Sequence, residues 1–338
     1  MKTALRTLAV VFGAALMAYG ASGYKIVDRW PIPGTGGWDY VYLDAGARRL
    51  YISHSTQVEV MDADSGKMVG TITDTPGVHG IAIAPAFKHG FTSNGRENKV
   101  SMFDPATLAL IKKIDVGKGP DGIYYHPGSK RVFTNNHGTD DITAIDAATG
   151  NVVGTVKVGG AGEQPVFGRD GLIYVNLEDS AEVVAFDPQS LEVKHRFPIG
   201  VAKTPTGLAY DAKSNRLFVM CREKPLMVVM DAGSGKVISS FPIGAGVDWA
   251  EFDSGSKTIF ASSGAGTLSI FHEKSADAYE DEGALTTQPS AKTMAFDPKS
   301  KKIFMPAAEI VVTPNADPSK RPTRTTKPGS FVMLVLAK

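Results

Sequence analysis

Short apolar and polar segments alternate along the chain with a period close to 42 residues. Each period contains an apolar stretch, a small polar cluster, a second apolar stretch and a turn that contains Asp. One residue of each polar cluster serves as its anchor: Trp38, His79, Asp121, Gln164, Thr206, Asp248 and Lys292. No period contains the amphipathic helix that helical repeats of this length require, so the pattern predicts the blades of a β-propeller.

The third period shows how one blade is expected to form. Residues 121–136 and 142–158 are rich in β-branched and aromatic residues, and turn-forming sequences interrupt them at 126–129 and 146–150. Runs of this kind between Gly, Pro, Asp and Ser clusters are typical of short strands joined by tight turns. Corresponding turns begin with an aspartate at Asp62, Asp104, Asp187 and Asp231. We therefore expect four antiparallel strands in each blade.

The two ends of the chain indicate the number of blades and how the ring closes. The last period, residues 292–338, contains an insertion at 313–330 and is otherwise too short for a complete blade. The segment 24–34 resembles the outer strand expected at 236–244, so it supplies the missing strand beside residues 331–336. The prediction is an all-β, seven-bladed propeller of four-stranded antiparallel blades, closed by the N-terminal strand, with residues 23–338 forming a single domain. Closure of this kind removes a free sheet edge.

The first 22 residues are predicted to be a signal peptide rather than part of the fold. Lys2 and Arg6 precede an apolar run at 8–18, and small residues follow it. This run is about half the roughly 20 residues that a membrane-spanning helix needs. We expect a periplasmic or secreted protein without a membrane span after cleavage. The single cysteine, Cys221, cannot form an internal disulfide and is expected to be buried.

The balance of charges gives little reason to expect a nucleic acid or an anionic membrane as the partner. The formal net charge is +1, and 21% of the residues are charged. The insertion at 313–330 is a local exception, because it carries Lys320, Arg321, Arg324 and Lys327 against one acid. Its prolines favour an extended polyproline conformation, which predicts a basic arm for an anionic ligand or an acidic partner. The alternative is a solvated loop without a partner.

A short phrase recurs at the end of the second strand of the blades. It reads LYISH at 50–54, GFTSN at 90–94, VFTNN at 132–136, LIYVN at 172–176 and LFVMC at 217–221. With the turns that follow, this phrase resembles the YVTN-repeat seven-bladed β-propellers, in particular the YncE-like exported bacterial proteins. The resemblance covers residues 24–338. It implies a WD40-like propeller architecture and a binding function, and it supplies no shared catalytic motif.

In a propeller, the segment before each inner strand and the loop between the second and third strands lie on the same face. We therefore expect the chemically varied residues of these segments to line one mouth of the central channel and to bind a small molecule or a protein partner. The alternative is that they only hydrate the mouth and satisfy backbone groups at strand ends. The candidate ligand-binding residues are His54, His79, Asn94, Asp121, Asn136, His137, Gln164, Asn176, Arg222, Asp248 and Lys292.

Catalysis is not required by any motif, and no cofactor is expected. A competing hypothesis is a metal-assisted hydrolase of the lactonase type, with a divalent ion near His54, His79, Asp121 or Asn136, and His137 as a further imidazole. Asp121, Glu163 and Asp248 would supply a general acid or base in such a reaction. The chain has no His-x-x-x-His motif or cysteine pair to support a metal site. A monomer that binds its ligand without turnover is therefore the primary prediction.

Overall fold

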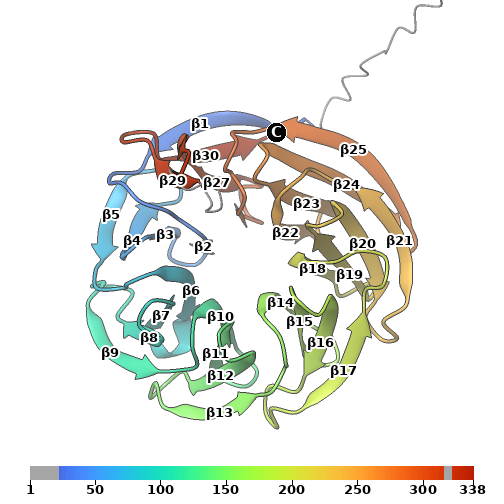
Figure 1. The fold of residues 1–338 in the computed structure, drawn as a ribbon, viewed down its shortest axis with the longest axis horizontal. Coiled ribbons are helices and arrows are strands. Elements are labelled where there is room, and N and C mark those ends of the chain that lie inside the picture. The colour runs from blue at the N-terminus through green and yellow to red at the C-terminus, as the bar shows by residue number, and fades with distance from the viewer. Residues whose placement is uncertain (1–22, 316–321) are drawn as a thin grey trace, which may run out of the picture.

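Seven four-stranded antiparallel sheets surround a central channel in the computed structural model, which describes residues 23–315 and 322–338 (Figure 1). The predicted signal peptide at 1–22, and Lys320 and Arg321 of the basic insertion, lie outside the described residues. Within the described part, the helical structure is one 3-10 turn, η1 (Pro85–Phe87). No helix in that part is long and apolar enough to cross a membrane. The all-β, seven-bladed prediction is confirmed.

Six blades run from the inner to the outer strand in chain order. The first two contain β2 (Val41–Asp44), β3 (Arg49–His54), β4 (Gln57–Asp62) and β5 (Met68–Ile72), then β6 (Val78–Ala84), β7 (His89–Asn94), β8 (Lys99–Phe103) and β9 (Leu110–Asp115). The next two contain β10 (Pro120–His126), β11 (Arg131–Asn136), β12 (Asp141–Asp146) and β13 (Val152–Val156), then β14 (Gly162–Phe167), β15 (Ile173–Leu177), β16 (Glu182–Phe186) and β17 (Val193–Pro198). Blades five and six contain β18 (Pro205–Asp211), β19 (Arg216–Cys221), β20 (Leu226–Asp231) and β21 (Val237–Pro242), then β22 (Val247–Asp253), β23 (Thr258–Ser263), β24 (Thr267–Ser275) and β25 (Ala278–Thr286).

The seventh blade is assembled from both ends of the chain. Its strands, from the channel outward, are β26 (Ala295–Phe296), β27 (Ile303–Ala307), β30 (Val332–Ala337) and β1 (Lys25–Pro31). Trp30 pairs with Met333 in the antiparallel ladder and packs its ring against Phe304, with 5.7 Å between the ring centroids. The N-terminal strand therefore closes the ring as predicted, and it buries an aromatic side chain at the junction.

A buried aromatic residue in the second strand of every blade fills the space between neighbouring sheets. These residues are Tyr51, Phe91, Phe133, Tyr174, Phe218, Phe260 and Phe304, and each is at most 1% exposed. They belong to apolar clusters that span adjacent blades. Because flat rings pack closely between twisted sheets, the recurring phrase of the sequence carries much of the core.

The aspartates that open the turns after the third strands stabilise those turns directly. In each turn one carboxylate oxygen accepts backbone N–H groups from the residues two and three positions later. These Asx turns occur at Asp62, Asp104, Asp146, Asp187 and Asp231. The predicted turn chemistry is therefore present in five blades, and it lets the chain reverse without leaving backbone donors unpaired.

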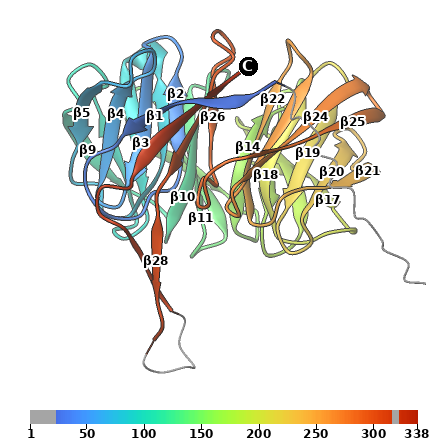
Figure 2. The same cartoon turned by 90° about the horizontal axis from the view of Figure 1, so that it is seen from above.

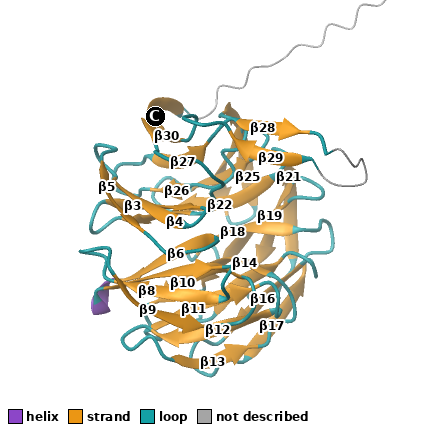
Figure 3. Cartoon of the chain, turned by 60° about the vertical axis from the view of Figure 1, so that its left-hand side comes forward, coloured by secondary structure: helices purple, strands orange, loops and turns teal. Residues whose placement is uncertain are grey.

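The insertion in blade seven differs from the extended arm that its prolines predicted. It forms a two-stranded antiparallel hairpin, β28 (Ile310–Thr313) and β29 (Thr323–Thr326), which projects from the disc (Figures 2 and 3). The β-branched residues Ile, Val and Thr on these strands favour an extended conformation, and the two strands pair through the backbone. The hydroxyl of Thr326 donates to the carbonyl of Gly36 at 2.6 Å, which ties the hairpin to the loop before blade one.

Candidate functional site

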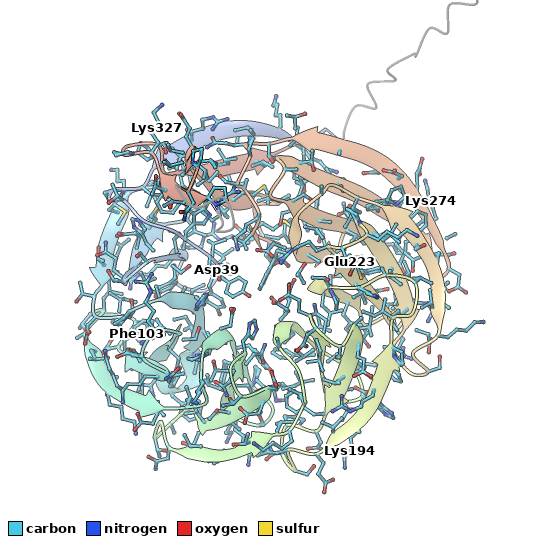
Figure 4. All side chains as sticks on the ribbon, viewed as in Figure 1. Asp39, Phe103, Lys194, Glu223, Lys274 and Lys327 are labelled. Atoms are coloured by element: carbon cyan, nitrogen blue, oxygen red, sulfur yellow. The ribbon has the colours of Figure 1, made fainter. Side chains whose placement is uncertain are left out.

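Seven side chains, one from each blade, occupy equivalent positions where the inner strands begin. In blades two to six each is the second residue of the inner strand, and in blades one and seven it lies two or three residues before that strand. We call this set the mouth ring: Asp39, His79, Asp121, Glu163, Thr206, Asp248 and Lys292. Figure 4 shows Asp39 at the edge of the central channel. Thr206 is buried and donates its hydroxyl to the carbonyl of Val247, so the other six members carry the chemistry of the ring.

Two sequence anchors were one residue away from the ring. In blade four, Gly162 at the start of β14 pairs with Leu177, whereas the recurring phrase ends at Asn176. This offset gives Glu163 the ring position in place of Gln164. In blade one, Asp39 takes the place expected for Trp38.

The two displaced residues have structural contacts instead. Trp38 stacks on Phe331, with 4.9 Å between the ring centroids. Gln164 reaches across to blades five and six, where its amide oxygen accepts the N–H groups of Leu208 and Ala250, both at 3.0 Å. Its amide nitrogen donates to the carbonyl of Ala250 at 2.8 Å. Gln164 therefore links three inner strands, and both its amide oxygen and its amide nitrogen form hydrogen bonds with backbone groups.

Lys292 and His79 hold the carboxylate of Asp39 between them. The Lys292 ammonium lies 2.8 Å from Asp39 and 2.7 Å from Asp248, and His79 Nδ1 lies 2.7 Å from the other oxygen of Asp39. Burial alone would raise the pKa of Asp39, but Lys292 and His79 hold it below its usual value. Burial would lower the pKa of His79, but hydrogen bonding to Asp39 and the charge of Asp121 raise it. This part of the ring is therefore an ordered pairing of opposite charges.

The negative charges of the next two carboxyl groups of the ring, Asp121 and Glu163, are less well compensated by nearby positive charge. His137 Nδ1 lies 3.7 Å from Asp121, while its Nε2 donates to the carbonyl of Gly162 at 2.8 Å. Burial and the nearby charge of Asp39 raise the pKa of Asp121. Burial and the charges of Asp121 and Asp248 raise the pKa of Glu163 well above its usual value. A ligand that brings positive charge here would relieve this repulsion.

Arg222, from the loop after β19, completes the mouth on the far side. Its guanidinium bonds Asp248 and also Glu178, the latter at 3.1 Å. With Glu178 included, five carboxyl groups of the mouth face two permanent cations, Lys292 and Arg222. The mouth therefore has an excess of acidic groups, although the whole chain is nearly neutral.

The ends of the second strands do not contribute to the mouth as the sequence suggested. Asn94 donates to Glu97 and Ser101, and Asn136 donates to Asp141 and Thr143, all within their own blades. His54 is also buried. These side chains point toward the third strand because successive residues of a strand face opposite sides.

The preceding position in the strand makes the contact with the next blade. Asn135 donates to the carbonyl of Glu163 at 2.7 Å, and Ser262 donates to the carbonyl of Lys292 at 2.6 Å. Because of the offset in blade four, Asn176 occupies this position, is fully buried, and has no hydrogen-bond partner among the described residues for either amide atom. Asn135 and Ser262 therefore help to position the backbone of the mouth ring.

One triad in the ring has the spacing that a metal ion requires. Asp39, His79 and Asp121 each offer one ligand atom, and the three atoms lie within 4.8 Å of one another. His79 and Asp121 were predicted for this role, whereas Asp39 was not. His54 lies elsewhere, because its Nδ1 is 3.2 Å from Glu59 and its ring packs against Phe331. The metal hypothesis therefore applies to a different set of ligands from the predicted one.

The hairpin of blade seven borders a cleft of about 1300 Å³ beside the mouth. Lys292 of the ring and Arg324 of β29 both line it. Lys327, predicted to interact with a partner, forms an exposed ion pair with Glu309 at 2.7 Å. Two of the four basic residues of the insertion, Arg324 and Lys327, lie in the described part of the chain, and of these Arg324 lines the cleft.

Sequence reasoning missed the aromatic layer below the ring. The Tyr40 hydroxyl donates to Glu163 at 3.4 Å, and the Tyr40 ring lies 5.1 Å from that of Trp249. Both residues line a cavity that also includes Glu163 of the ring. The available signal was the presence of aromatic residues in inner strands, where residues face the channel.

Comparisons with known proteins agree with this architecture. A chain of the mitotic checkpoint complex superposes with a TM-score of 0.73 at 12% identity, covering 97% of this chain and 99% of that chain. A chain of hydrazine synthase from Kuenenia stuttgartiensis gives a TM-score of 0.71 at 15% identity, covering 88% and 98%. At these identities the similarity concerns the fold alone. No curated protein matches the chain significantly.

The recurring phrase and the blade architecture are accompanied by a match at the family level. The profile described as YNCE-like beta-propeller matches residues 78–246, from the inner strand of blade two to the end of blade five. This match covers half of the 338 residues. The chain therefore belongs to the YNCE-like β-propeller family.

Proposed function

We propose that this propeller is a binding module whose mouth ring takes a small molecule or a protein segment with a positively charged group. The observation that carries the proposal is the convergence of six ionisable side chains from six blades, four carboxyl groups, one imidazole and one amine, on one opening. An asymmetric ligand needs such unlike contacts from a symmetric scaffold. The excess of carboxyl groups sets the sign of the charge that the ligand brings.

The partly compensated pair Asp121 and Glu163 is the expected contact for the cation. Glu163 is 10% exposed at its side chain and Asp121 is 16% exposed, so both are shielded from bulk water. A guanidinium or ammonium group placed between them would form charge-assisted hydrogen bonds. The cleft of about 1300 Å³ beside the hairpin leaves room for the rest of the ligand.

The experiment is a titration of the protein with methylguanidinium, acetate and acetamide, followed by the NMR signals of His79 and His137. Methylguanidinium is expected to shift these signals and to lose at least about tenfold in affinity in Asp121→Asn, because a charged hydrogen bond is lost. Glu280→Asn, on the exposed outer strand β25, serves as the control. Equal responses to all three probes, or an unchanged affinity in Asp121→Asn, would refute the proposal.

The second candidate function is metal-assisted hydrolysis, and the Asp39–His79–Asp121 triad favours it. An ion bound there would activate water or polarise a carbonyl. We expect this candidate to give micromolar or tighter Zn²⁺ or Mn²⁺ binding that Asp39→Asn abolishes, together with turnover of cyclic esters. Metal binding without turnover would favour the module, and the absence of both would eliminate the hydrolase.

We also propose that the protein works outside the cytoplasm, on the basis of the charged, apolar and small-residue segments within residues 1–22. Mass spectrometry of the protein from a periplasmic fraction would test this. Loss of about the first 22 residues is expected. Recovery of the full-length chain from the cytoplasm would contradict it.

A further inference from the structure

The lower half of the channel is a separate cavity lined by aromatic side chains. It has a volume of about 550 Å³, and its lining extends to Pro85 and Pro127, which follow the ends of β6 and β10 away from the mouth. We call this cavity the aromatic funnel. Its walls include Tyr40, Tyr42, Tyr124, Phe167 and Trp249, from blades one, three, four and six. A neighbouring hollow of about 470 Å³ shares several of these residues and continues toward blades five and seven.

The aromatic rings of the funnel are not all used for packing the core. Phe167 remains 41% exposed, although it lies on an inner strand and lines the cavity. Trp249 and Tyr42 are partly exposed, in contrast to the aromatic residues between the blades, which are fully buried. Partly exposed aromatic side chains that converge in a concave site of this volume are typical of small-molecule binding sites.

The charged side chains that line the funnel and the neighbouring hollow are acidic. Glu163, a member of the mouth ring, also lines the funnel, and Glu251 lines the neighbouring hollow. The Trp249 indole N–H donates to Glu251 at 3.0 Å and fixes this carboxyl group beside the ring. Among the described residues, no Lys or Arg lines either the funnel or the neighbouring hollow. Aromatic faces and carboxylates without a competing cation attract positive charge.

We propose that the aromatic funnel binds a small organic cation, a quaternary or protonated amine with an apolar body. The rings of Trp249 and Tyr40 would contact the cationic head, and Glu251 would provide the counter-charge. Phe167 and Tyr124, whose ring centroids lie 6.3 Å apart, would contact the apolar body. This site differs from the mouth ring in the residues that line it, and Glu163 is the member of the ring that the two share.

The test compares choline with its neutral carbon analogue, 3,3-dimethylbutan-1-ol, which has the same shape without the charge. Binding is followed by the NMR signal of the Trp249 indole N–H, assigned with Trp249→Phe. Choline is expected to bind at least about tenfold more tightly than the alcohol, because only the cation gains from the ring faces and the carboxylate. Benzyltrimethylammonium is expected to bind more tightly than choline, since its ring adds apolar contact.

Variants locate the site. Glu251→Gln preserves the shape and an acceptor for Trp249, and it should reduce choline affinity at least about tenfold. Phe167→Leu, at a partly exposed position, should weaken benzyltrimethylammonium more than choline. Glu280→Gln on β25 is the matched control for loss of one negative charge, and Asp39→Asn tests the mouth.

Each outcome decides the proposal. Selective loss in Glu251→Gln, with Asp39→Asn and Glu280→Gln unchanged, supports the funnel site. Equal affinity for choline and the alcohol overturns it. So does choline binding that Asp39→Asn removes while the Trp249 signal stays unchanged, because this result would place the cation at the mouth ring.

Discussion

Replacing Lys292 with methionine is expected to destabilise the ring at its closing blade. Lys292 extends from blade seven to Asp39 of blade one, at 2.8 Å, and to Asp248 of blade six, at 2.7 Å. Asp248 is 9% exposed and Asp39 is 17% exposed at the side chain, so neither carboxylate is fully hydrated. Methionine retains the length of the side chain but leaves both carboxylates without their shared cation.

The magnitude follows from the remaining partners. Removing one member of a buried ion pair costs about 3–5 kcal/mol. Here Asp39 keeps His79 and Asp248 keeps Arg222, and the Lys292 side chain is 37% exposed, so solvent screens part of the effect. We therefore expect the free energy of unfolding to fall by about 2 kcal/mol at neutral pH. For a chain of this size, that change shifts Tm by only a few degrees.

Urea unfolding followed by tryptophan fluorescence is the more sensitive assay, and its pH dependence gives the sign test. Lys292 lowers the pKa of Asp39, so its stabilisation is present while the carboxylate is ionised and is lost as the pH falls through the carboxylate pKa. The difference between Lys292→Met and the original protein should therefore be fully present at neutral pH and shrink as the pH falls below about 4. Lys99→Met, which removes the cation paired with the exposed carboxylate of Asp115, is a control for loss of a lysine.

Two results would refute this reasoning. One is a Lys292→Met variant as stable as the original protein at neutral pH. The other is a loss of stability that does not change with pH, because it would indicate lost packing rather than uncompensated charge. The double variant with Asp39→Asn should recover part of the loss, since it removes one of the two carboxylates.

Three further predictions concern the closure, the channel and its titration. Trp30→Ala should lower the free energy of unfolding by about 3–5 kcal/mol, because it leaves a cavity in the closing blade; a loss as small as that of Val27→Ala, at a half-exposed position of the same strand, would contradict this role. Gln164→Leu should cost about 3 kcal/mol in urea unfolding, because buried backbone groups of blades five and six lose their partner, and an unchanged stability would exclude the cross-channel link. Burial raises the pKa of Glu251 to about 7, so the Trp249 indole N–H signal should titrate near neutral pH and stop doing so in Glu251→Gln. Because this pKa lies above the usual 4.5, the folded protein favours the neutral carboxyl group of Glu251. The free energy of unfolding should therefore fall as the pH rises from about 4.5 through about 7. A free energy of unfolding without an inflection in that range would contradict this prediction.

The sequence was sufficient for the architecture because the relevant signals are local and repeated. Strand runs, Asx turns such as that at Asp62, and a period near 42 residues predicted seven blades. The incomplete last period predicted that the segment 24–34 closes the ring, and β1 (Lys25–Pro31) does so. The aromatic residues of the phrase at the second strand, such as Phe133, are buried in the core of the structure.

The membership of the site was decided only by the tertiary structure. His79, Asp121, Asp248 and Lys292 reach the mouth ring as the repeat suggested, whereas Gln164 does not. A strand alternates its side chains with a period of two, so an offset of one residue moves a side chain from the channel to the blade interior. In blade four, Gly162 pairs with Leu177 rather than with Asn176, and the sequence does not mark this offset.

The same reason explains the aromatic funnel and the hairpin. Tyr40, Phe167 and Trp249 are far apart in sequence, and only the closing of the ring places them around one cavity. The prolines of the insertion indicated a polyproline arm, but pairing between Val311 and Thr325 produced a hairpin. Local patterns therefore determined which strands form and how many blades they make, whereas the register between strands and the packing of blades decided which side chains meet in the channel.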